Sequence, residues 1–358
     1  MNKHIRVLIA DDSSLARGLL RAILEDEAGI EVVGEATNGR QAVALARELR
    51  PDLITMDLEM PLMNGMAAIE EIMCDKAVPI LVVSSVADAQ NALEAIRRGA
   101  LEVVGKPDYT AAEAADFVAK VRLLAGVSVI TRMRPRPVAT ALRTEPPAVS
   151  PEMSRPPEKE GATSYRHVFA IAASTGGPQA LAQILPALPA DFPCPVLVAQ
   201  HISDGFAGGM AEWLDGLCRL PVRLAAEGDL LRAGVIYISP SERHLGVTPT
   251  RRATLVERGP RDIYRPSCDV MLDSVAEVFG RQAIGIILTG MGSDGAKGIA
   301  RIREAGGMTL GQDEASSVIY GMNRVAIEAG GVRRVLPVAE IAGEMRRLAD
   351  PYSLAGAA

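Results

Sequence analysis

The sequence lacks three features that would assign it to a familiar class: paired cysteines, an excess of basic residues and a long apolar run. Its four cysteines are scattered without a C-x-x-C pair, so neither a zinc site nor a disulfide framework is indicated. The net charge of −6 argues against a general nucleic-acid or membrane-surface binder, since such proteins need a basic face. The apolar run Val7 to Ala10 stops at Asp11, too early for a signal peptide, and no later run could span a bilayer. We therefore expect a cytoplasmic protein with reduced cysteines.

With 358 residues, the chain is long enough for two domains that each bury a core. Residues 1–125 form the first predicted domain, in which short β-rich runs alternate with longer amphipathic ones. The predicted strands and clearest helices are Ile5–Ala10, Ile30–Ala36, Leu53–Met56, Ile80–Val83 and Glu102–Val104, and Ser14–Asp26 and Gly39–Leu49. This alternation predicts an α/β fold with a doubly wound parallel sheet, whose chemistry lies at the carboxyl ends of the strands.

Polar residues follow four of these strands. They are Asp11 and Asp12, Asp57, Ser84, and Lys106. Three carboxylates at one crevice repel each other, so they need a hard divalent cation or the Lys106 ammonium group to stay ionised together. Magnesium suits such a site because it takes a few carboxylates and keeps its waters. The alternative, separate loop acids that happen to follow strands, is the weaker interpretation for five residues at four strand ends.

Residues 126–163 are rich in proline and poor in apolar periodicity, which predicts a semi-rigid linker. Residues 164–358 form the second predicted domain, where strand–helix alternation returns. Its predicted strands are Val168–Ala173, Pro195–Ala199, Val235–Ile238, Ala283–Leu288 and Met308–Leu310. A second doubly wound parallel α/β sheet is expected here.

A candidate nucleophile follows the first strand of this second sheet. Val168–Ala173 runs into a tight turn, Ser174-Thr175-Gly176-Gly177, after which Pro178 opens a helix over Gln179–Leu185. This geometry would lift the Ser174 hydroxyl out of the strand end and set it against free backbone N–H groups, where an oxyanion could be held. The turn resembles a nucleophile elbow without matching G-x-S-x-G. A plain helix cap by Ser174 is the alternative interpretation.

A nucleophilic serine needs a base and a carboxylate that orients it. His201 directly follows a buried run and so shares the sheet edge with Ser174. Asp294 follows the strand Ala283–Leu288 and is held between glycines, which places it at the same edge. The weaker candidates are His244, in a polar loop, and the acids Asp204 and Asp269.

The stretch around Asp294 also supports a different function. Gly290-x-Gly292-x-x-Gly295 follows a strand and opens a helix, and Asp313 ends the next strand. Those are the contexts of a dinucleotide-binding site. Against this interpretation, the unit is not the first βαβ of its domain, and it would leave Ser174 and His201 without a purpose.

The first domain resembles the response-regulator receiver family. DDSS at 11–14, MDLEMPLMNG at 56–65, VSS at 83–85 and KP at 106–107 carry the resemblance, over about the first 120 residues. It implies a flavodoxin-like fold in which Asp57 accepts phosphate from a histidine kinase. It further implies that Mg²⁺ is bound by Asp11, Asp12 and Asp57 together with the backbone carbonyl of Glu59.

The receiver resemblance also gives roles to two other residues: Ser84 would hydrogen-bond the phosphoryl group and Lys106 would pair with it. One departure is visible, because Val103 stands where many receivers carry an aromatic residue, which argues against an aromatic rotamer switch. A receiver-controlled DNA-binding protein is a further alternative. It requires a basic helix-turn-helix, and the second domain offers glycine-rich strand ends instead.

The second domain resembles the catalytic domain of the chemotaxis protein-glutamate methylesterases. ASTGGP at 173–178, AQHI at 199–202, RPSCDVMLDSVA at 265–276, LTGMGSDGA at 288–296 and YGM at 320–322 carry it. The resemblance implies a Rossmann-like three-layer α/β fold with Ser174 as nucleophile, His201 as base and Asp294 as its orienting partner. The backbone N–H of Met291 would contact the oxyanion. Departures from the family pattern occur at Asn323 and at Ser241-Glu242.

Together the two resemblances imply a phosphorylation-regulated hydrolase of chemotaxis signalling. It would demethylate glutamate methyl esters, and deamidate glutamines, on methyl-accepting chemoreceptors, with a chemotaxis histidine kinase as phosphodonor. The unphosphorylated receiver would obstruct the catalytic cleft. Hydrolysis would need no cofactor, Mg²⁺ would serve the receiver alone, and we expect neither nucleic-acid binding nor membrane insertion.

Overall fold

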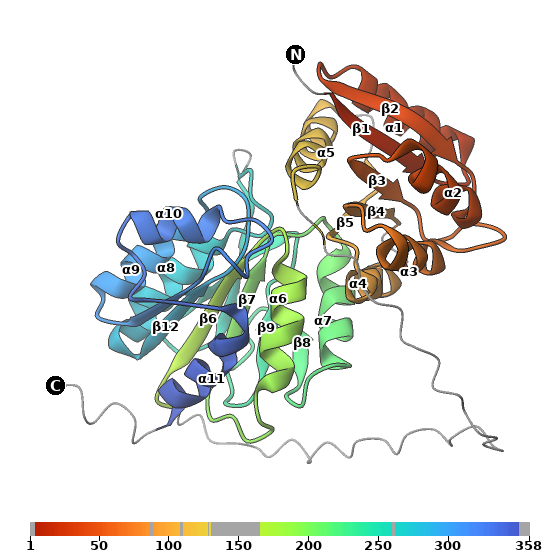
Figure 1. The fold of residues 1–358 in the computed structure, drawn as a ribbon. Coiled ribbons are helices and arrows are strands. Elements are labelled where there is room, and N and C mark those ends of the chain that lie inside the picture. Colours follow the sequence, from red (N-terminus) through yellow and green to blue (C-terminus); the bar gives the residue numbers. More distant parts are fainter. Residues whose placement is uncertain are drawn as a thin grey trace, which may run out of the picture.

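The computed structural model describes residues 4–85, 89–107, 110–127, 129, 165–259 and 262–350. We call residues 4–129 the N-terminal unit and residues 165–350 the C-terminal unit. Each is built on a parallel sheet with helices on both faces (Figure 1). Most of the linker expected at 126–163 lies outside the described residues.

The N-terminal unit is a five-stranded parallel sheet in the order β2-β1-β3-β4-β5. Its strands are β1 (Ile5–Ala10), β2 (Ile30–Ala36), β3 (Leu53–Met56), β4 (Ile80–Ser84) and β5 (Glu102–Gly105). Its helices are α1 (Ser14–Glu25), α2 (Gly39–Leu49), α3 (Gly65–Asp75), α4 (Ala89–Arg98) and α5 (Ala111–Leu124). Helices α1 and α5 cover one face of the sheet, and α2, α3 and α4 cover the other. The doubly wound sheet expected from the sequence is confirmed.

Local sequence explains where these helices begin. Ser13, Asn38, Asn64 and Thr110 precede α1, α2, α3 and α5, and each side-chain oxygen accepts a hydrogen bond from a backbone N–H in the first turn. Such caps satisfy donors that a helix leaves unpaired, worth about 1 kcal/mol each. Strands β3 and β4 are buried at every residue, as parallel strands covered on both faces require.

The C-terminal unit is a seven-stranded parallel sheet in the order β14-β13-β12-β6-β7-β9-β8. Its strands are β6 (Val168–Ala173), β7 (Val196–Gln200), β8 (Val222–Leu224), β9 (Ile236–Ile238), β12 (Ala283–Ile287), β13 (Met308–Gln312) and β14 (Arg334–Leu336). A separate antiparallel hairpin is formed by β10 (Arg243–Val247) and β11 (Ala253–Glu257).

Helices cover both faces of this second sheet, giving the three-layer fold that the resemblance implied. On one face lie α6 (Gly177–Ile184), α7 (Phe206–Asp215) and α11 (Val338–Ala349). On the other lie α8 (Cys268–Phe279), α9 (Ala296–Glu304) and α10 (Met322–Glu328). Short 3₁₀ helices, η2 (Leu185–Ala187) and η3 (Gly280–Gln282), extend α6 and α8.

Strand order places the crevice of the C-terminal unit. From β6 the chain proceeds to β7 on one side of the sheet, and it returns later to β12 on the other side. Neighbouring strands from which the connections leave in opposite directions open a crevice at their carboxyl ends. The ends of β6, β7 and β12 are therefore where binding and chemistry are expected in this sheet.

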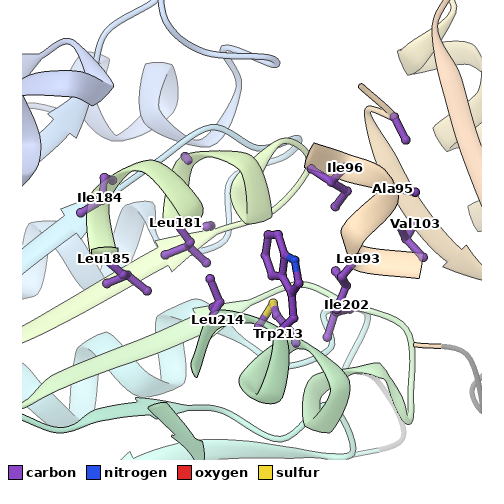
Figure 2. Close-up of a cluster of buried hydrophobic side chains, with 14 of the residues drawn as sticks. Leu93, Ala95, Ile96, Val103, Leu181, Ile184, Leu185, Ile202, Trp213 and Leu214 are labelled. Atoms are coloured by element: carbon purple, nitrogen blue, oxygen red, sulfur yellow. The ribbon is translucent and has the colours of Figure 1, made fainter. Parts of the chain in front are cut away.

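The two units share one buried apolar cluster, and helix α4 lies beside α7 (Figure 1). Figure 2 shows Leu93, Ile96 and Val103 of the N-terminal unit facing Trp213 and Leu181 of the C-terminal unit. Two interdomain hydrogen bonds fix this contact, from Trp213 Nε1 to Glu94 Oε2 (3.4 Å) and from Gln179 Nε2 to the carbonyl of Ala100 (2.9 Å). Buried apolar area makes this a packed interface, although polar atoms set its register.

One histidine makes the stability of the C-terminal unit sensitive to acid. His167 lies buried just before β6, and burial lowers the pKa of its imidazole below the usual value. The unfolded chain therefore takes up a proton first as the pH falls, so folding stability is present above the unfolded pKa and is lost below it. We expect His167→Gln to lose melting temperature less steeply than the parent over roughly pH 7 to 5. Parallel slopes, or an equal effect of the exposed His4→Gln control, would contradict this.

Candidate active site and phosphorylation site

The three side chains singled out in the second domain lie at the crevice between the strand ends. Ser174 directly follows β6 and His201 directly follows β7, and these strands pair in register at Ala173 and Gln200. The His201 N–H donates to the carbonyl of Ala173 (3.0 Å). Asp294 lies in the loop between β12 and α9, and its side chain contacts His201. The sheet thus brings together residues that are 120 positions apart in the chain.

The turn after β6 is fixed by backbone hydrogen bonds. The Ser174 N–H donates to the carbonyl of Thr289 (3.1 Å), and the Ser174 carbonyl accepts from the Gly177 N–H (2.7 Å). Gly176 is the N-cap of α6, with φ 78°, and no side chain caps the helix. The interpretation of Ser174 as a plain helix cap was wrong. Its hydroxyl has no hydrogen-bond partner within the part of the chain that the structure describes.

Gly176 must be glycine for two reasons. A left-handed φ strains any other residue except asparagine or aspartate, and a Cβ here would lie 2.5 Å from Cβ of Val318. The nucleophile turn therefore packs directly against the loop that follows β13.

The imidazole of His201 is oriented by Asp294. Nε2 of His201 and Oδ2 of Asp294 are 2.8 Å apart. Asp294 also accepts hydrogen bonds from the backbone N–H groups of Cys268 (2.6 Å) and Asp269 (3.0 Å) and from the hydroxyl of Ser267 (3.2 Å). Burial opposes ionisation of Asp294, but the hydrogen bond and charge of His201 and the two N–H donors outweigh it and lower its pKa. The ionised carboxylate makes Nε2 the protonated nitrogen, which leaves Nδ1 as an acceptor.

Tyr264 completes the setting of the imidazole. Its ring stacks on His201 with centroids 5.0 Å apart and an interplanar angle of 15°. The Tyr264 hydroxyl lies against Gly292, where a Cβ would be only 3.1 Å from it. Nothing in the sequence pattern singled out Tyr264, because it lies in an irregular segment between β11 and α8 without periodicity.

The turn at 289–292 lies against the nucleophile. A Cβ on Gly290 would lie 2.6 Å from Cβ of Ser174, so only glycine allows this approach. Gly290 is held by the Ile319 carbonyl, which accepts from its N–H (3.0 Å), and by the Met322 N–H, which donates to its carbonyl (2.8 Å). Among described residues, no hydrogen-bond partner is seen for the N–H of Met291. A free backbone donor therefore lies one residue from the Ser174 contact.

The dinucleotide interpretation of this glycine motif is not favoured. Gly292 and Gly295 do adopt left-handed conformations, with φ 89° and 88°, and Gly295 is the N-cap of α9. A Cβ on Gly295 would touch Ala172 and Cys268, so this glycine serves helix–strand packing. The Asp313 carboxylate is engaged within its own loop, since Oδ1 accepts from the Ser316 N–H (3.1 Å).

The rival base and acids are engaged elsewhere. His244 is a buried residue of β10, so the expected polar loop was wrong. Its short strand gave too little alternation to be seen in the sequence. Its Nε2 is 2.9 Å from Asp262 Oδ2, and its Nδ1 accepts from the Ser267 N–H (2.9 Å). The two rival acids are also used: Asp204 pairs with Arg258, and Asp269 accepts from the Gly298 N–H.

Both departures from the family pattern have a structural use. Asn323 is fully buried and donates from Nδ2 to the Gln312 carbonyl (3.0 Å) and to Ser317 Oγ (2.8 Å), which ties down the loop after β13. Ser241 Oγ and Glu242 Oε1 both accept from the N–H of Gly205 (3.1 and 2.7 Å), the N-cap of α7. They anchor the helix that packs on the N-terminal unit.

In the N-terminal unit, acidic side chains gather at the ends of β1 and β3. Oxygens of Asp11, Asp12 and Asp57 lie within 4.8 Å of one another. Lys106 Nζ lies between two of them, 2.8 Å from Asp11 and 3.1 Å from Asp57. Ser84 is buried at the end of β4. An all-oxygen, carboxylate-rich set open on the side of the exposed Asp12 is suited to Mg²⁺.

Protonation at this site is governed by competing effects. Burial raises the pKa of Asp57 and the Asp11 charge adds to this, and the hydrogen bond from Lys106 offsets it only in part. For Lys106, burial would lower the pKa, but the hydrogen bonds and charges of Asp11 and Asp57 outweigh it and raise the pKa. A divalent cation here would favour ionised carboxylates.

Comparison with known proteins agrees with this two-part arrangement. Residues 7–119 match the response regulator receiver domain and residues 169–345 match the CheB methylesterase model. A protein-glutamate methylesterase/protein-glutamine glutaminase from Paramagnetospirillum magneticum is 58% identical over 95% of both chains. The chain belongs to this methylesterase family. Another member, from Anaeromyxobacter dehalogenans, is 45% identical over 97% of this chain and 98% of its own.

The family's catalytic domain is also known from a solved structure. The CheB methylesterase catalytic domain of Thermotoga maritima is 36% identical and aligns with a TM-score of 0.50, covering 52% of this chain and 99% of that one. The family is one of hydrolases coupled to a response regulator, and the expectation of an enzyme is confirmed. In the described part of this chain, no helix is both long and apolar enough to cross a membrane.

Proposed function

We propose that this chain hydrolyses glutamate methyl esters, and deamidates glutamines, on methyl-accepting chemotaxis receptors. The observation that carries the proposal is the alignment of Ser174 and His201 at the ends of paired strands, with Asp294 2.8 Å from the imidazole. Domain boundaries at 1–125 for the receiver, 126–163 for the linker and 164–358 for the catalytic domain are part of it.

The proposed reaction is acyl transfer to water. Ser174 Oγ attacks the side-chain carbonyl carbon, Nδ1 of His201 takes the hydroxyl proton, and the imidazolium returns it to methanol, or to ammonia, as the leaving group departs. Water then attacks the acyl-enzyme by the same route. Asp294 stabilises the imidazolium through Nε2, and the lowered pKa keeps this carboxylate ionised. Ester and amide share a tetrahedral intermediate, so one site serves both.

The backbone N–H of Met291 is the proposed donor to the oxyanion. Its neighbour Gly290 lies against Ser174, and the turn is rigidly held. Donors fixed in advance of the reaction stabilise developing charge without reorganisation, and one such donor contributes about 10²–10³ in rate. No metal or organic cofactor takes part in these steps.

Gln200 ties nucleophile and base together, which gives a testable prediction. Its buried Nε2 donates to the carbonyls of both Ser174 and His201, at 2.8 Å each. We expect Gln200→Met and Gln200→Glu to lower kcat with little change in KM, on the order of a hundredfold, because misplacement of reacting groups by about 1 Å has that cost. The glutamate variant should be the more impaired, since its carboxylate faces two carbonyl oxygens. An exposed control, Gln282→Glu, should retain kcat, and equal kcat in all three variants would exclude the role.

The receiver is the proposed phosphorylation switch. Asp57 would accept the phosphoryl group from a chemotaxis histidine kinase, and Asp11, Asp12 and Asp57 would hold Mg²⁺ with the carbonyl of Glu59. The bound cation would supply positive charge beside the phosphoryl oxygens. Lys106 would exchange its contact with Asp57 for the phosphoryl group, and Ser84 would donate a hydrogen bond to it.

The interface explains how this charge reaches the catalytic unit. The N-terminal unit touches residues adjacent to the active site: the Gly105 N–H donates to Ser203 Oγ (3.4 Å), and Gln179 of α6 donates to Ala100. Ser203 is two residues from His201, and Gln179 is five from Ser174. We propose that the unphosphorylated receiver restricts access here and that phosphorylation shifts the equilibrium towards an open state.

Methanol release from a methylated receptor, with and without acetyl phosphate, tests this function. We expect the parent to be stimulated and Asp57→Asn to show its basal rate under both conditions, because no acyl phosphate can form. The Mg²⁺-dependent stimulation should be lost while Ser174-dependent turnover remains. Full stimulation of Asp57→Asn would remove the receiver from the scheme, and tight NAD binding without turnover would favour the dinucleotide alternative.

A further inference from the structure

A cysteine thiol lies beside the proposed catalytic imidazole. Cys268 is the first residue of α8, and its side chain is completely buried. Its Sγ is 3.5 Å from Nε2 of His201 and 3.4 Å from the Ala199 carbonyl. The hydrolysis proposed above gives this thiol no task, since only the backbone N–H of Cys268 contacts Asp294.

Three different donor atoms therefore converge on one point. Nε2 of His201, Sγ of Cys268 and a carboxylate oxygen of Asp294 lie within 4.8 Å of one another. Nitrogen, thiolate and carboxylate ligands surround a tetrahedral Zn²⁺ at about 2.0–2.3 Å, which separates them by roughly 3.3–3.6 Å. The nitrogen–sulfur distance of 3.5 Å already has this value, and the 2.8 Å contact would need to open by a few tenths of an ångström.

We propose that His201, Cys268 and Asp294 form an inhibitory site for Zn²⁺ or a similar thiophilic divalent cation. The ion replaces the proton between Nε2 and Asp294, and Cys268 binds as thiolate, releasing its proton to solvent. The Nε2 proton leaves as Nδ1 gains one, so one proton is released per ion bound. The cluster of Zn²⁺, thiolate and carboxylate is then electrically neutral, which limits the cost of holding it in a buried site.

The consequence for turnover follows from the tautomer. With the ion on Nε2, the neutral imidazole carries its remaining proton on Nδ1, the nitrogen proposed above to accept the Ser174 proton. The base is then blocked without any change in the nucleophile. Loss of a general base costs on the order of 10²–10⁴ in rate. This inhibitory effect rests on the proposed function, whereas the binding of the ion does not.

Donor chemistry separates this site from the receiver site. The receiver offers oxygens alone, which favour Mg²⁺, and the catalytic cluster offers nitrogen and sulfur, which Mg²⁺ avoids. Millimolar Mg²⁺ in an assay should therefore leave hydrolysis unaffected while occupying the Asp11, Asp12 and Asp57 cluster. A softer ion should act at the catalytic cluster even when Mg²⁺ is in excess.

Cobalt substitution of the full-length protein tests the site directly. With Mg²⁺ in excess, one equivalent of Co²⁺ should give a thiolate-to-cobalt charge-transfer band, which Cys268→Ala and Cys268→Ser should both lack. The buried Cys218→Ser is the matched control and should keep the band. Absence of the band in the parent, or its persistence in both Cys268 variants, would overturn the proposal, and it reports binding whether or not the protein hydrolyses esters.

The activity measurement follows from the same set of proteins. Each variant is compared with its own chelator-treated rate. Saturating Zn²⁺ should lower the parent and Cys218→Ser at least about a hundredfold, and chelator should restore both, whereas the two Cys268 variants should lose tenfold less or better. A cobalt band without inhibition would overturn the blocked base. A parent protein with no turnover in chelator would instead count against the proposed function.

Discussion

Ser174→Ala is expected to abolish methanol release from methylated receptors while leaving the fold unchanged. Loss of a triad serine elsewhere costs on the order of 10⁶ in kcat, because the acyl-enzyme route is closed and only binding and the oxyanion donor remain. The fold should survive because both hydrogen bonds that fix Ser174 come from its backbone. The hydroxyl has no structural partner among the residues described.

A matched control makes this result specific. Ser239 is also a buried serine that directly follows a strand of the same sheet, β9, and its hydroxyl only bonds the neighbouring Pro240 carbonyl (3.3 Å). Ser239→Ala should keep its turnover within a few-fold of the parent. Melting temperature, activity and covalent labelling by a phosphonate should be measured on both variants. Labelling of Ser174→Ala at the parent's rate, or retained turnover, would exclude Ser174 as the nucleophile.

The location of these side chains could be predicted because parallel sheets obey a simple rule. Strand Val168–Ala173 was expected at its true bounds, and the residues after β6, β7 and β12 were expected at a common edge. That rule needs only the register of strands and turns, which hydrophobic runs and glycines mark well. It does not need the details of side-chain packing. For the same reason, the acids after β1 and β3 could be found from sequence.

The supporting residues could not be predicted because their partners come from irregular segments. Tyr264 and Ser267 lie in a stretch with no hydrophobic period, and only the fold brings them to His201 and Asp294. His244 lies in a short two-stranded hairpin with few residues to show alternation. The packing of Trp213 against α4 joins two units that are far apart along the chain. Long-range contacts of this kind leave no local pattern.

Asp294→Asn is expected to reduce kcat by about ten-thousandfold, the cost of the equivalent change in another serine hydrolase. The ionised carboxylate accepts four hydrogen bonds, from His201, Ser267 and the backbone N–H groups of Cys268 and Asp269. An amide offers one accepting oxygen, and its NH₂ group would face at least one of these donors. To bond that NH₂, the imidazole would have to present an unprotonated Nε2, which places its proton on Nδ1 and blocks proton uptake from Ser174.

The neighbouring carboxylate separates this electrostatic role from a structural one. Asp269 is half-buried next to Asp294, and its Oδ1 accepts from the Gly298 N–H (2.8 Å) in the first turn of α9. Asp269→Asn should lower the melting temperature by weakening this cap, but kcat should remain within a few-fold because no contact with His201 is removed. Asp294→Asn should show the reverse, with kcat falling at every pH and KM little changed. If Asp294→Asn lost only a few-fold, or if both variants lost kcat equally, another acid would have to orient the imidazole.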